Sequence, residues 1–156
     1  MKAIVTGSFD PFTLGHLELV KYASSKYDIV YVVALNNADK NYMFSSEERK
    51  DIISLSISDI ENAVADAYEG FTADYMNEHG VTHIVRGVRG PQDIEYEQTL
   101  AEKMKEFNPN FETELVICKP EFKDISSTEA RRRINNNEPL KSILHESVIK
   151  CINEKK

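Results

Sequence analysis

Apolar residues along the chain follow two periods, and their alternation predicts strands and helices in turn. Residues 2–6 and 28–35 are apolar, β-branched stretches with almost no polar break, as expected for strands that are covered on both faces. Between them, Leu17, Leu19, Val20 and Ala23 lie close to helical spacing. This part of the chain therefore predicts a strand, a crossover helix and a second strand.

The alternation continues to the C-terminus. Ser45 and Glu48 form a Ser-x-x-Glu capping box ahead of a helix with one apolar face. Residues 62–68, 82–85 and 112–119 predict three further strands, and residues 71–79 predict a helix that ends at Gly80. Residues 93–107 predict another helix, and residues from 126 onward predict a helix followed by one or two short ones.

Strands that alternate with helices and are joined by short loops predict the α/β class. We expect a Rossmann-like, doubly wound, mainly parallel five-stranded sheet with right-handed crossovers and C-terminal helices. A length of 156 residues fits a single domain over residues 1–156.

In such folds, ligands bind beyond the carboxyl ends of the strands, near the point where the strand order reverses. The segments that follow the five predicted strands carry most of the unusual residues: 7–16, 36–43, 71–72, 86–90 and 122–131. Five such loops at one edge of a sheet predict a single site.

Composition narrows the function classes. Apolar residues make up 41% and charged residues 29%, as in ordinary soluble domains. No stretch approaches the ~18 consecutive apolar residues of a membrane span, and the N-terminus lacks a signal-peptide pattern, so we expect a cytoplasmic protein with no membrane partner. The net charge of −7 argues against broad nucleic-acid binding. Positive groups for an anionic ligand must therefore be concentrated locally.

The two cysteines suggest no special chemistry. Cys118 and Cys151 lie far apart, without a Cys-x-x-Cys pair or a histidine at ligand spacing. We expect neither a zinc site nor a disulfide, but two plain buried or semi-buried thiols.

Residues 7–16 form the segment with the clearest chemical character. Gly7 and Gly15 permit tight backbone geometry, and Pro11 stiffens the loop between them. If His16 starts a helix, its imidazole lies beside unpaired N–H groups where a phosphate would bind. The alternative is an ordinary strand-to-helix turn with a packed or solvated histidine. The pattern is neither a Walker motif nor Gly-x-Gly-x-x-Gly.

Two motifs together carry a resemblance. GSFDP followed by TLGH, residues 7–16, resembles the (Thr/His)-x-Gly-His signature of the nucleotidyltransferase superfamily, which uses ATP or CTP. ISSTEAR, residues 125–131, resembles its second signature, Ile-Ser-Ser-Thr-x-x-Arg. Ser126 and Glu129 would also form a capping box, so this stretch alone could be a plain helix start.

Further segments resemble the bacterial phosphopantetheine adenylyltransferase family. They are RGVR at 86–89, DIEYE at 93–97, Lys40 before Met43 and Phe44, and the EER helix start at 47–49. The resemblance covers essentially the whole chain. It implies transfer of the adenylyl group of ATP to 4′-phosphopantetheine, giving dephospho-coenzyme A and pyrophosphate in coenzyme A biosynthesis.

The resemblance also implies roles for residues of this chain. His16 would stabilise the transition state at the α-phosphate, with Lys40 and Arg89 as further catalytic groups. The acceptor would contact Ser8, Lys40, Thr72 and Arg86. The ATP side would comprise Ser8, Phe9, His16, Gly87, Val88, Arg89, Glu97, Phe122, Lys123, Asp124, Ile125, Ser126, Ser127, Thr128 and Arg131.

Several of these assignments have alternatives. Without the resemblance, Lys40 would be interpreted as a solvated loop lysine. Asp93 and Glu97 could likewise form a solvated acidic face of a helix. Ser8 stands where the family more often has threonine, and Thr72 where an apolar residue is commoner.

The chemistry of the implied reaction suits this set. The acceptor phosphate, with a second pKa near ~6, is largely a dianion at neutral pH and needs no general base. We expect Mg²⁺ to arrive with the ATP phosphates and no metal site on the protein. The protonation of His16 stays open, because a helix start disfavours imidazolium whereas bound phosphates favour it.

Three other functions are alternatives to adenylyl transfer onto 4′-phosphopantetheine. A superfamily member could adenylylate nicotinamide mononucleotide or cytidylylate glycerol 3-phosphate, and a sensing module could bind ATP without turnover. The segment at 86–97 and the pairing of Lys40 with Arg86 favour the phosphopantetheine enzyme. The resemblance further implies a homohexamer and coenzyme A as a feedback inhibitor.

Overall fold

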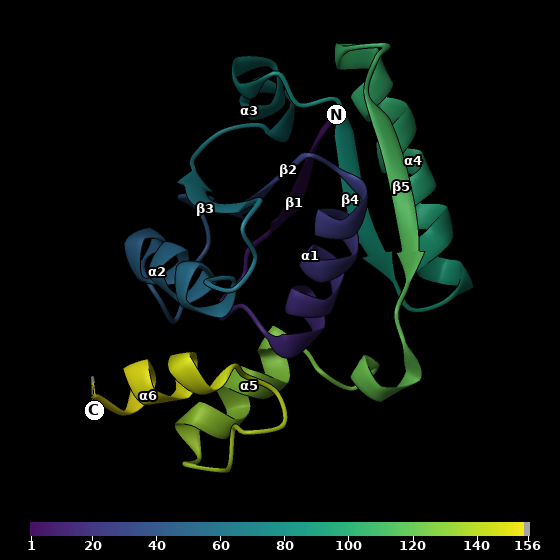
Figure 1. Ribbon diagram of the computed structural model, residues 1–156. Helices are drawn as coiled ribbons and strands as arrows, with labels where there is room; N and C mark the ends of the chain where they lie inside the picture. Colours follow the sequence, from purple (N-terminus) through teal and green to yellow (C-terminus); the bar gives the residue numbers. More distant parts are fainter. Residues whose placement is uncertain (155–156) are drawn as a thin grey trace.

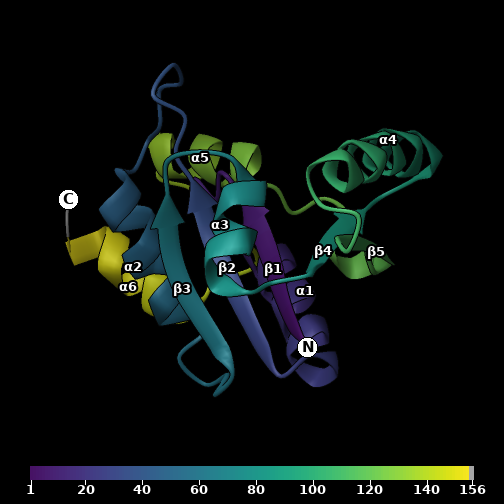
Figure 2. The same ribbon diagram turned by 90° about the horizontal axis from the view of Figure 1, so that it is seen from above.

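The computed structural model describes residues 1–154 and contains a five-stranded, all-parallel sheet (Figure 1). Figure 2 shows the strands from one edge to the other in the order β3, β2, β1, β4, β5. Their bounds are β1 (Lys2–Gly7), β2 (Ile29–Leu35), β3 (Ala63–Tyr68), β4 (His83–Val88) and β5 (Glu112–Ile117). The predicted fold class and five strands are confirmed.

Helices connect the strands and close the C-terminal end. They are α1 (Leu14–Lys26), α2 (Ser46–Ser56), α3 (Thr72–His79), α4 (Pro91–Phe107), α5 (Ser127–Asn135) and α6 (Glu146–Glu154). A short 3₁₀ turn, η1 (Pro120–Phe122), was not predicted. Figure 1 shows α5 and α6 below the sheet, at the carboxyl end of the strands.

The core has two layers because successive strand residues point to opposite faces. Ala3 and Val5 of β1 pack into the larger cluster, which also holds buried residues of α1, α2, α5 and α6. Ile4 lies in the smaller cluster on the other face, with Tyr75 and Met76 of α3. The C-terminal helices are thus part of the core and not an appendage.

Helix ends follow capping chemistry. Ser45 and Glu48 form the predicted capping box. Gly80 ends α3 with φ of 67°, in the left-handed region. The first helix begins earlier than His16, at Leu14, because the Thr13 hydroxyl accepts the His16 N–H at 3.4 Å and makes Thr13 the N-cap.

The fourth strand is longer than predicted. Residues 86–88 were expected in a loop, but they continue β4, since its pairing with β5 extends from His83 with Glu112 to Val88 with Ile117. By contrast, β1 pairs with β4 only at Ala3 and Ile4. The two strands therefore separate toward their carboxyl ends, at the reversal of strand order where such folds bind ligands.

The structure also bears on the two cysteines and on membrane-spanning helices. Cys118 and Cys151 are both free thiols of intermediate exposure, in agreement with the prediction. Within residues 1–154, none of the helices is long and apolar enough to span a bilayer.

Candidate functional site

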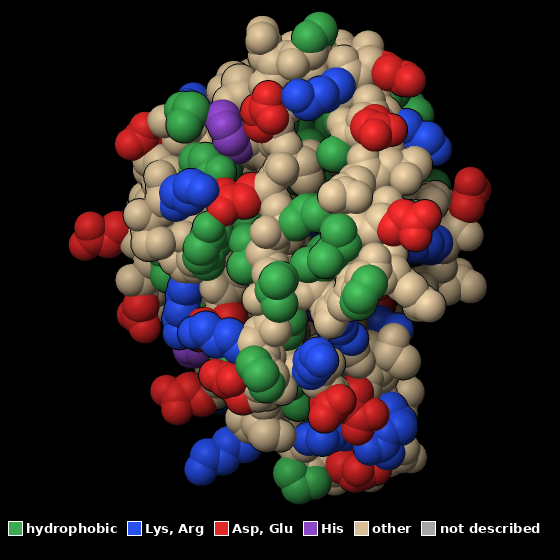
Figure 3. Space-filling model, turned by 90° about the vertical axis from the view of Figure 1, so that its right-hand side faces the viewer, with side chains coloured by type: hydrophobic (Ala, Val, Ile, Leu, Met, Phe, Trp, Pro, Cys, Tyr) green, Lys and Arg blue, Asp and Glu red, His purple; other side chains and the backbone are tan. Residues whose placement is uncertain are grey.

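A cleft of about 610 Å³ lies where β1 and β4 separate. Its walls come from the end of β1, the turn into α1, the middle of β4, the end of β5 and the loop before α5. Figure 3 shows Lys and Arg side chains interspersed with Asp and Glu in the lower half of the face seen there, the side of the carboxyl edge. Positive charge in the cleft itself comes from lining residues such as Arg86 and Arg89, in a chain with a net charge of −7.

The turn from β1 into α1 is tight. Phe9 has φ of 48°, and the Asp10–Pro11 peptide bond is cis. A Cβ on Gly7 would lie 3.0 Å from Cε1 of the Phe9 ring, so the glycine is needed for this close approach. The backbone at Gly7 therefore forms the tight strand-to-helix turn that the sequence predicted.

His16 is held by a hydrogen bond that fixes its tautomer. Its Nδ1 accepts the backbone N–H of Thr13 at 3.0 Å, so this nitrogen carries no proton. The remaining proton of the neutral ring lies on Nε2, which is free to donate to a group in the cleft that His16 lines. Phe9 and Phe12 contact the ring, with centroids 4.9 Å and 5.4 Å away.

The surroundings of His16 keep the ring uncharged. Burial lowers its pKa to about 4, and the positive charges of Arg89 and Arg86 act in the same direction. With its pKa lowered in this way and Nδ1 accepting the Thr13 N–H, His16 is a neutral Nε2–H donor at physiological pH.

Arg86 reaches from β4 into the gap between the two strands. Its Nη1 donates to the Thr6 carbonyl at 3.1 Å, and Nε and Nη2 each donate to the Glu97 carboxylate at 2.9 Å. Glu97, buried on α4, thus holds the guanidinium by a bidentate pair. Nη2 bears a second N–H, which is available for a phosphate.

Arg89 directly follows the end of β4 and also lines the cleft. Its backbone N–H donates to Asp93 at 3.0 Å, and its Nη2 donates to the Ile125 carbonyl at 2.7 Å. The side chain therefore joins the end of β4 to the loop before α5. Asp93 is exposed and accepts this N–H, whereas Glu97 is buried against Arg86, so the alternative of a solvated acidic face is wrong for Glu97.

The second signature docks onto the first. Ser127 Oγ donates to the Pro11 carbonyl at 2.7 Å, and Arg131 Nη1 donates to the Asp10 carbonyl at 2.8 Å. The Ser126 hydroxyl caps α5 by accepting the Glu129 N–H at 3.0 Å. The start of α5 is thereby tied to the turn that carries His16.

Of the capping box predicted for Ser126 and Glu129, only the bond from the Glu129 N–H to the Ser126 hydroxyl forms. The Glu129 carboxylate does not return to Ser126 but binds Arg132 and Arg133 instead. Arg132 also pairs with Glu138 on the surface.

The structure brings together about half of the predicted site residues. Those that line the cleft are Ser8, Phe9, His16, Arg86, Gly87, Arg89, Phe122, Ile125 and Ser127. Outside its lining are Lys40, Thr72, Val88, Glu97, Lys123, Asp124, Ser126, Thr128 and Arg131. Of these, Glu97 contacts the lining residue Arg86, and Arg131 contacts the turn at Asp10. Ser126 caps α5 by accepting the Glu129 N–H.

Lys40 and Thr72 lie at the ends of other strands. Lys40 is exposed in the loop after β2, where its N–H donates to the Asn37 carbonyl at 3.0 Å. Thr72 is the first residue of α3, next to Phe71, which is 74% exposed. Their assignments to the acceptor stay predictions.

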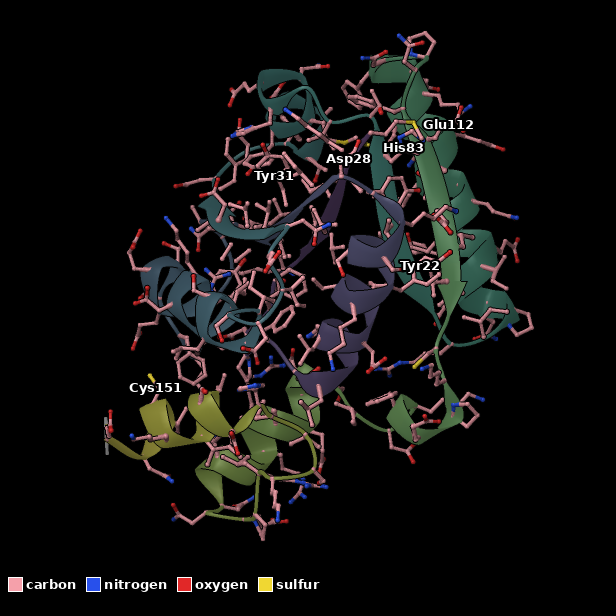
Figure 4. The ribbon with its side chains drawn as sticks, in the orientation of Figure 1. Tyr22, Asp28, Tyr31, His83, Glu112 and Cys151 are labelled. Carbon is pink, nitrogen blue, oxygen red and sulfur yellow. The ribbon has the colours of Figure 1, made fainter. Side chains whose placement is uncertain are left out.

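The cleft extends further along α1 than the motifs indicated. Leu19 and Tyr22 line it on one side, and Ile117 and Lys119 on the other. Figure 4 shows Tyr22 on the side of α1 toward β5, where its hydroxyl donates to Glu114. Helical spacing from His16 could have placed Leu19 and Tyr22 on this face, but no signal in the sequence pointed to the strand residues.

Metal-ligating side chains are not clustered here. Within the part of the chain that the structure describes, no group of three or more His, Cys, Asp or Glu side chains could hold a metal ion. The fixed cationic groups at this site are the arginines.

Comparison with known proteins identifies the family of this chain. The model of the cytidylyltransferase-like family matches residues 4–133. The phosphopantetheine adenylyltransferase of Bdellovibrio bacteriovorus is 38% identical over 153 residues, which cover 98% of this chain and 96% of that protein.

Similarity to a solved structure concerns the fold alone. A crystal structure described as a nicotinate-nucleotide adenylyltransferase from Vibrio parahaemolyticus superposes with a TM-score of 0.73 and 15% identity, covering 99% of this chain and 92% of that one. Matched signatures, a near full-length relative and the nucleotidyltransferase architecture lead to one assignment: the chain belongs to the phosphopantetheine adenylyltransferase family, within the cytidylyltransferase-like nucleotidyltransferases.

Proposed function

We propose that this chain transfers the adenylyl group of ATP to 4′-phosphopantetheine, giving dephospho-coenzyme A and pyrophosphate. The observation that carries the proposal is His16, whose neutral ring has one remaining donor, Nε2–H, in the wall of a cleft shared with Arg86 and Arg89. The relative from Bdellovibrio bacteriovorus, at 38% identity, supports the choice of reaction.

His16 acts as a hydrogen-bond donor to the α-phosphate. Charge grows on the oxygens of that phosphorus as the acceptor attacks in line, and a fixed donor stabilises this charge. The acceptor phosphate is the nucleophile and is already largely a dianion at pH 7, so no side chain needs to remove a proton. The reaction proceeds without a covalent enzyme intermediate.

The ATP side is formed by the α1 turn, the end of β4 and the start of α5. Arg89 and Ser127 line this side, and Arg131 holds it to the Asp10 carbonyl. The free N–H groups at a helix start favour phosphate, and the start of α5 offers them here. The substrate is the magnesium complex of ATP, with the ion held by phosphate oxygens.

The acceptor side uses Ser8, Lys40, Thr72 and Arg86. Arg86 is fixed by Glu97 and Thr6 and keeps donor capacity on Nη2. Lys40 is exposed on its loop and brings a second positive charge when the acceptor binds.

Assembly and location follow from the family. We expect a cytoplasmic homohexamer that also binds coenzyme A as an inhibitor in the same cleft. Exposed apolar side chains on α4 support assembly: Tyr96 and Phe107 are more than 60% exposed, and Glu97 is the buried residue of this helix.

An acceptor panel tests the proposal. Purified protein with MgATP and 4′-phosphopantetheine is expected to release pyrophosphate and form dephospho-coenzyme A, whereas nicotinamide mononucleotide and glycerol 3-phosphate support no release. Replacing ATP by CTP is expected to abolish turnover. Absence of dephospho-coenzyme A with the first acceptor would overturn the proposal, and turnover with another acceptor would identify a different member of the superfamily.

A further inference from the structure

Arg49, on the first half of α2, is a charged side chain with no exposed surface. Its exposed fraction is 0%, and it is the largest of the fully buried side chains. Burying a guanidinium is expensive unless its N–H groups find good acceptors. The identity of those acceptors shows what this residue connects.

The guanidinium binds oxygens from two loops of the site. Nη1 donates to the Ser8 carbonyl at 3.0 Å, after β1, and to the Leu35 carbonyl at 3.1 Å, at the end of β2. Nη2 donates to the Asn36 side chain, and Nε donates to the Phe44 carbonyl at 3.2 Å. One side chain therefore joins the turn at residues 7–16 to the loop at residues 36–45.

The loop is also wrapped around this side chain. The Tyr42 ring lies 3.8 Å from the guanidinium carbon, and its hydroxyl accepts the Asn37 N–H at 2.9 Å. These contacts flank Lys40, whose own N–H binds the Asn37 carbonyl. The position of Lys40 thus depends on a loop that is built on Arg49.

Asp10 makes a second link between the same two segments. Its carboxylate accepts the N–H groups of Met43 at 2.8 Å and Phe44 at 2.9 Å. Phe44 therefore bonds to Asp10 through its N–H and to Arg49 through its carbonyl. Two buried polar side chains therefore hold the loop against the turn through the two backbone polar groups of one residue, Phe44.

We propose that Arg49 is a positioning residue, which sets the loop carrying Lys40 against the Ser8 turn so that both can meet the acceptor phosphate. This inference rests on the proposed function. Arg49 is wholly buried and acts through the loop, without touching substrate. Lysine cannot replace it fully, since a single ammonium lacks the planar fork that reaches acceptors on several sides.

The test measures steady-state kinetics for both substrates in Arg49→Lys and Arg49→Met. We expect KM for 4′-phosphopantetheine to rise about tenfold or more in Arg49→Met and less in Arg49→Lys, with KM for ATP changed by less than about twofold. Lys50→Met is the control, because Lys50 is the next residue on α2 and is partly exposed. It is expected to leave both constants unchanged.

A double-mutant cycle with Lys40→Ala separates positioning from general stability. If Arg49 acts through the loop of Lys40, removing Lys40 first should reduce the effect of Arg49→Met on KM for the acceptor to about threefold or less. A merely structural role would lower kcat and raise both KM values in either background. Arg49→Lys keeps the cycle usable if Arg49→Met does not fold.

The outcomes are distinguishable from failure of the proposed function. Wild-type protein that forms no dephospho-coenzyme A overturns that function. Active wild-type protein whose Arg49 variants show equal changes for ATP and acceptor, or additive effects with Lys40→Ala, overturns the positioning role alone.

Discussion

The two sides of the candidate site differ in how firmly they are built. On the ATP side, His16, Arg89 and the start of α5 are joined to the α1 turn and to one another by hydrogen bonds to backbone atoms. On the proposed acceptor side, Arg86 is held by Glu97 and Thr6, but Lys40 is an exposed side chain, and Thr72 lies beside an exposed phenylalanine. The difference is expected if charge develops on one side only, because a donor that stabilises a transition state must already be in place.

The largest effect should come from removing the donor itself. In His16→Asn, the amide oxygen can still accept the Thr13 N–H, but the proton on Nε2 is lost. We expect kcat to fall by ~10²-fold or more with little change in KM for ATP. Steady-state kinetics with varied ATP measure both. If KM for ATP rises by as large a factor as kcat falls, His16 is a ground-state binding residue, and the contrast between the two sides disappears.

The next effect tests the docking of the second signature. Arg131→Met removes the bond to the Asp10 carbonyl, so we expect kcat/KM for ATP to fall about thirtyfold. The matched control is Arg132→Met, because Arg132 is the neighbouring residue but pairs with Glu129 and Glu138 on the surface. If both variants lose the same activity, the link between α5 and the turn has no part in ATP binding.

A smaller effect is expected on the acceptor side. Lys40→Ala should raise KM for 4′-phosphopantetheine about tenfold while kcat changes little, because a flexible surface charge aids binding more than it stabilises a transition state. The melting temperature should not change, since the side chain is exposed. A large fall in kcat with unaltered KM would instead place Lys40 among the preorganised groups.

The smallest effect concerns pH. The folded-state pKa of His16 is lowered to about 4, so between that value and 6.5 the unfolded chain binds a proton that the folded chain does not. Stability therefore falls as pH falls through this window, by about 0.7 kcal/mol from pH 7 to pH 6 for this group alone. Urea unfolding of the wild type and His16→Asn should show the difference, and identical pH slopes would contradict the lowered pKa.

Local patterns predicted the elements well and their edges less well. Ser45 and Gly80 marked a helix start and a helix end correctly because capping depends on neighbouring residues only. Arg86 and Gly87 were expected in a loop, because a charge and a glycine look like the end of a strand. Pairing with β5 keeps them in β4, and no neighbouring residue encodes that pairing.

For the site, the sequence named candidate side chains but not the contacts between them. The two signatures identified His16 and Ser127, yet nothing in them showed that Ser127 donates to Pro11 or that Glu97 binds Arg86. Arg49 was part of a family resemblance, but its burial and its links to Ser8 and Leu35 depend on the packing of α2.

The sequence by itself therefore determined the order of elements, the α/β class and the family, and it named the candidate site residues, because these depend on periodicity and on local chemical motifs. Only the tertiary structure decided the uncharged state of His16, the bidentate hold on Arg86 and the link that Arg49 makes between two loops. Each of these depends on burial and on partners that are distant in sequence, such as Glu97 for Arg86 and Ser8 for Arg49. Such contacts form when the whole chain packs.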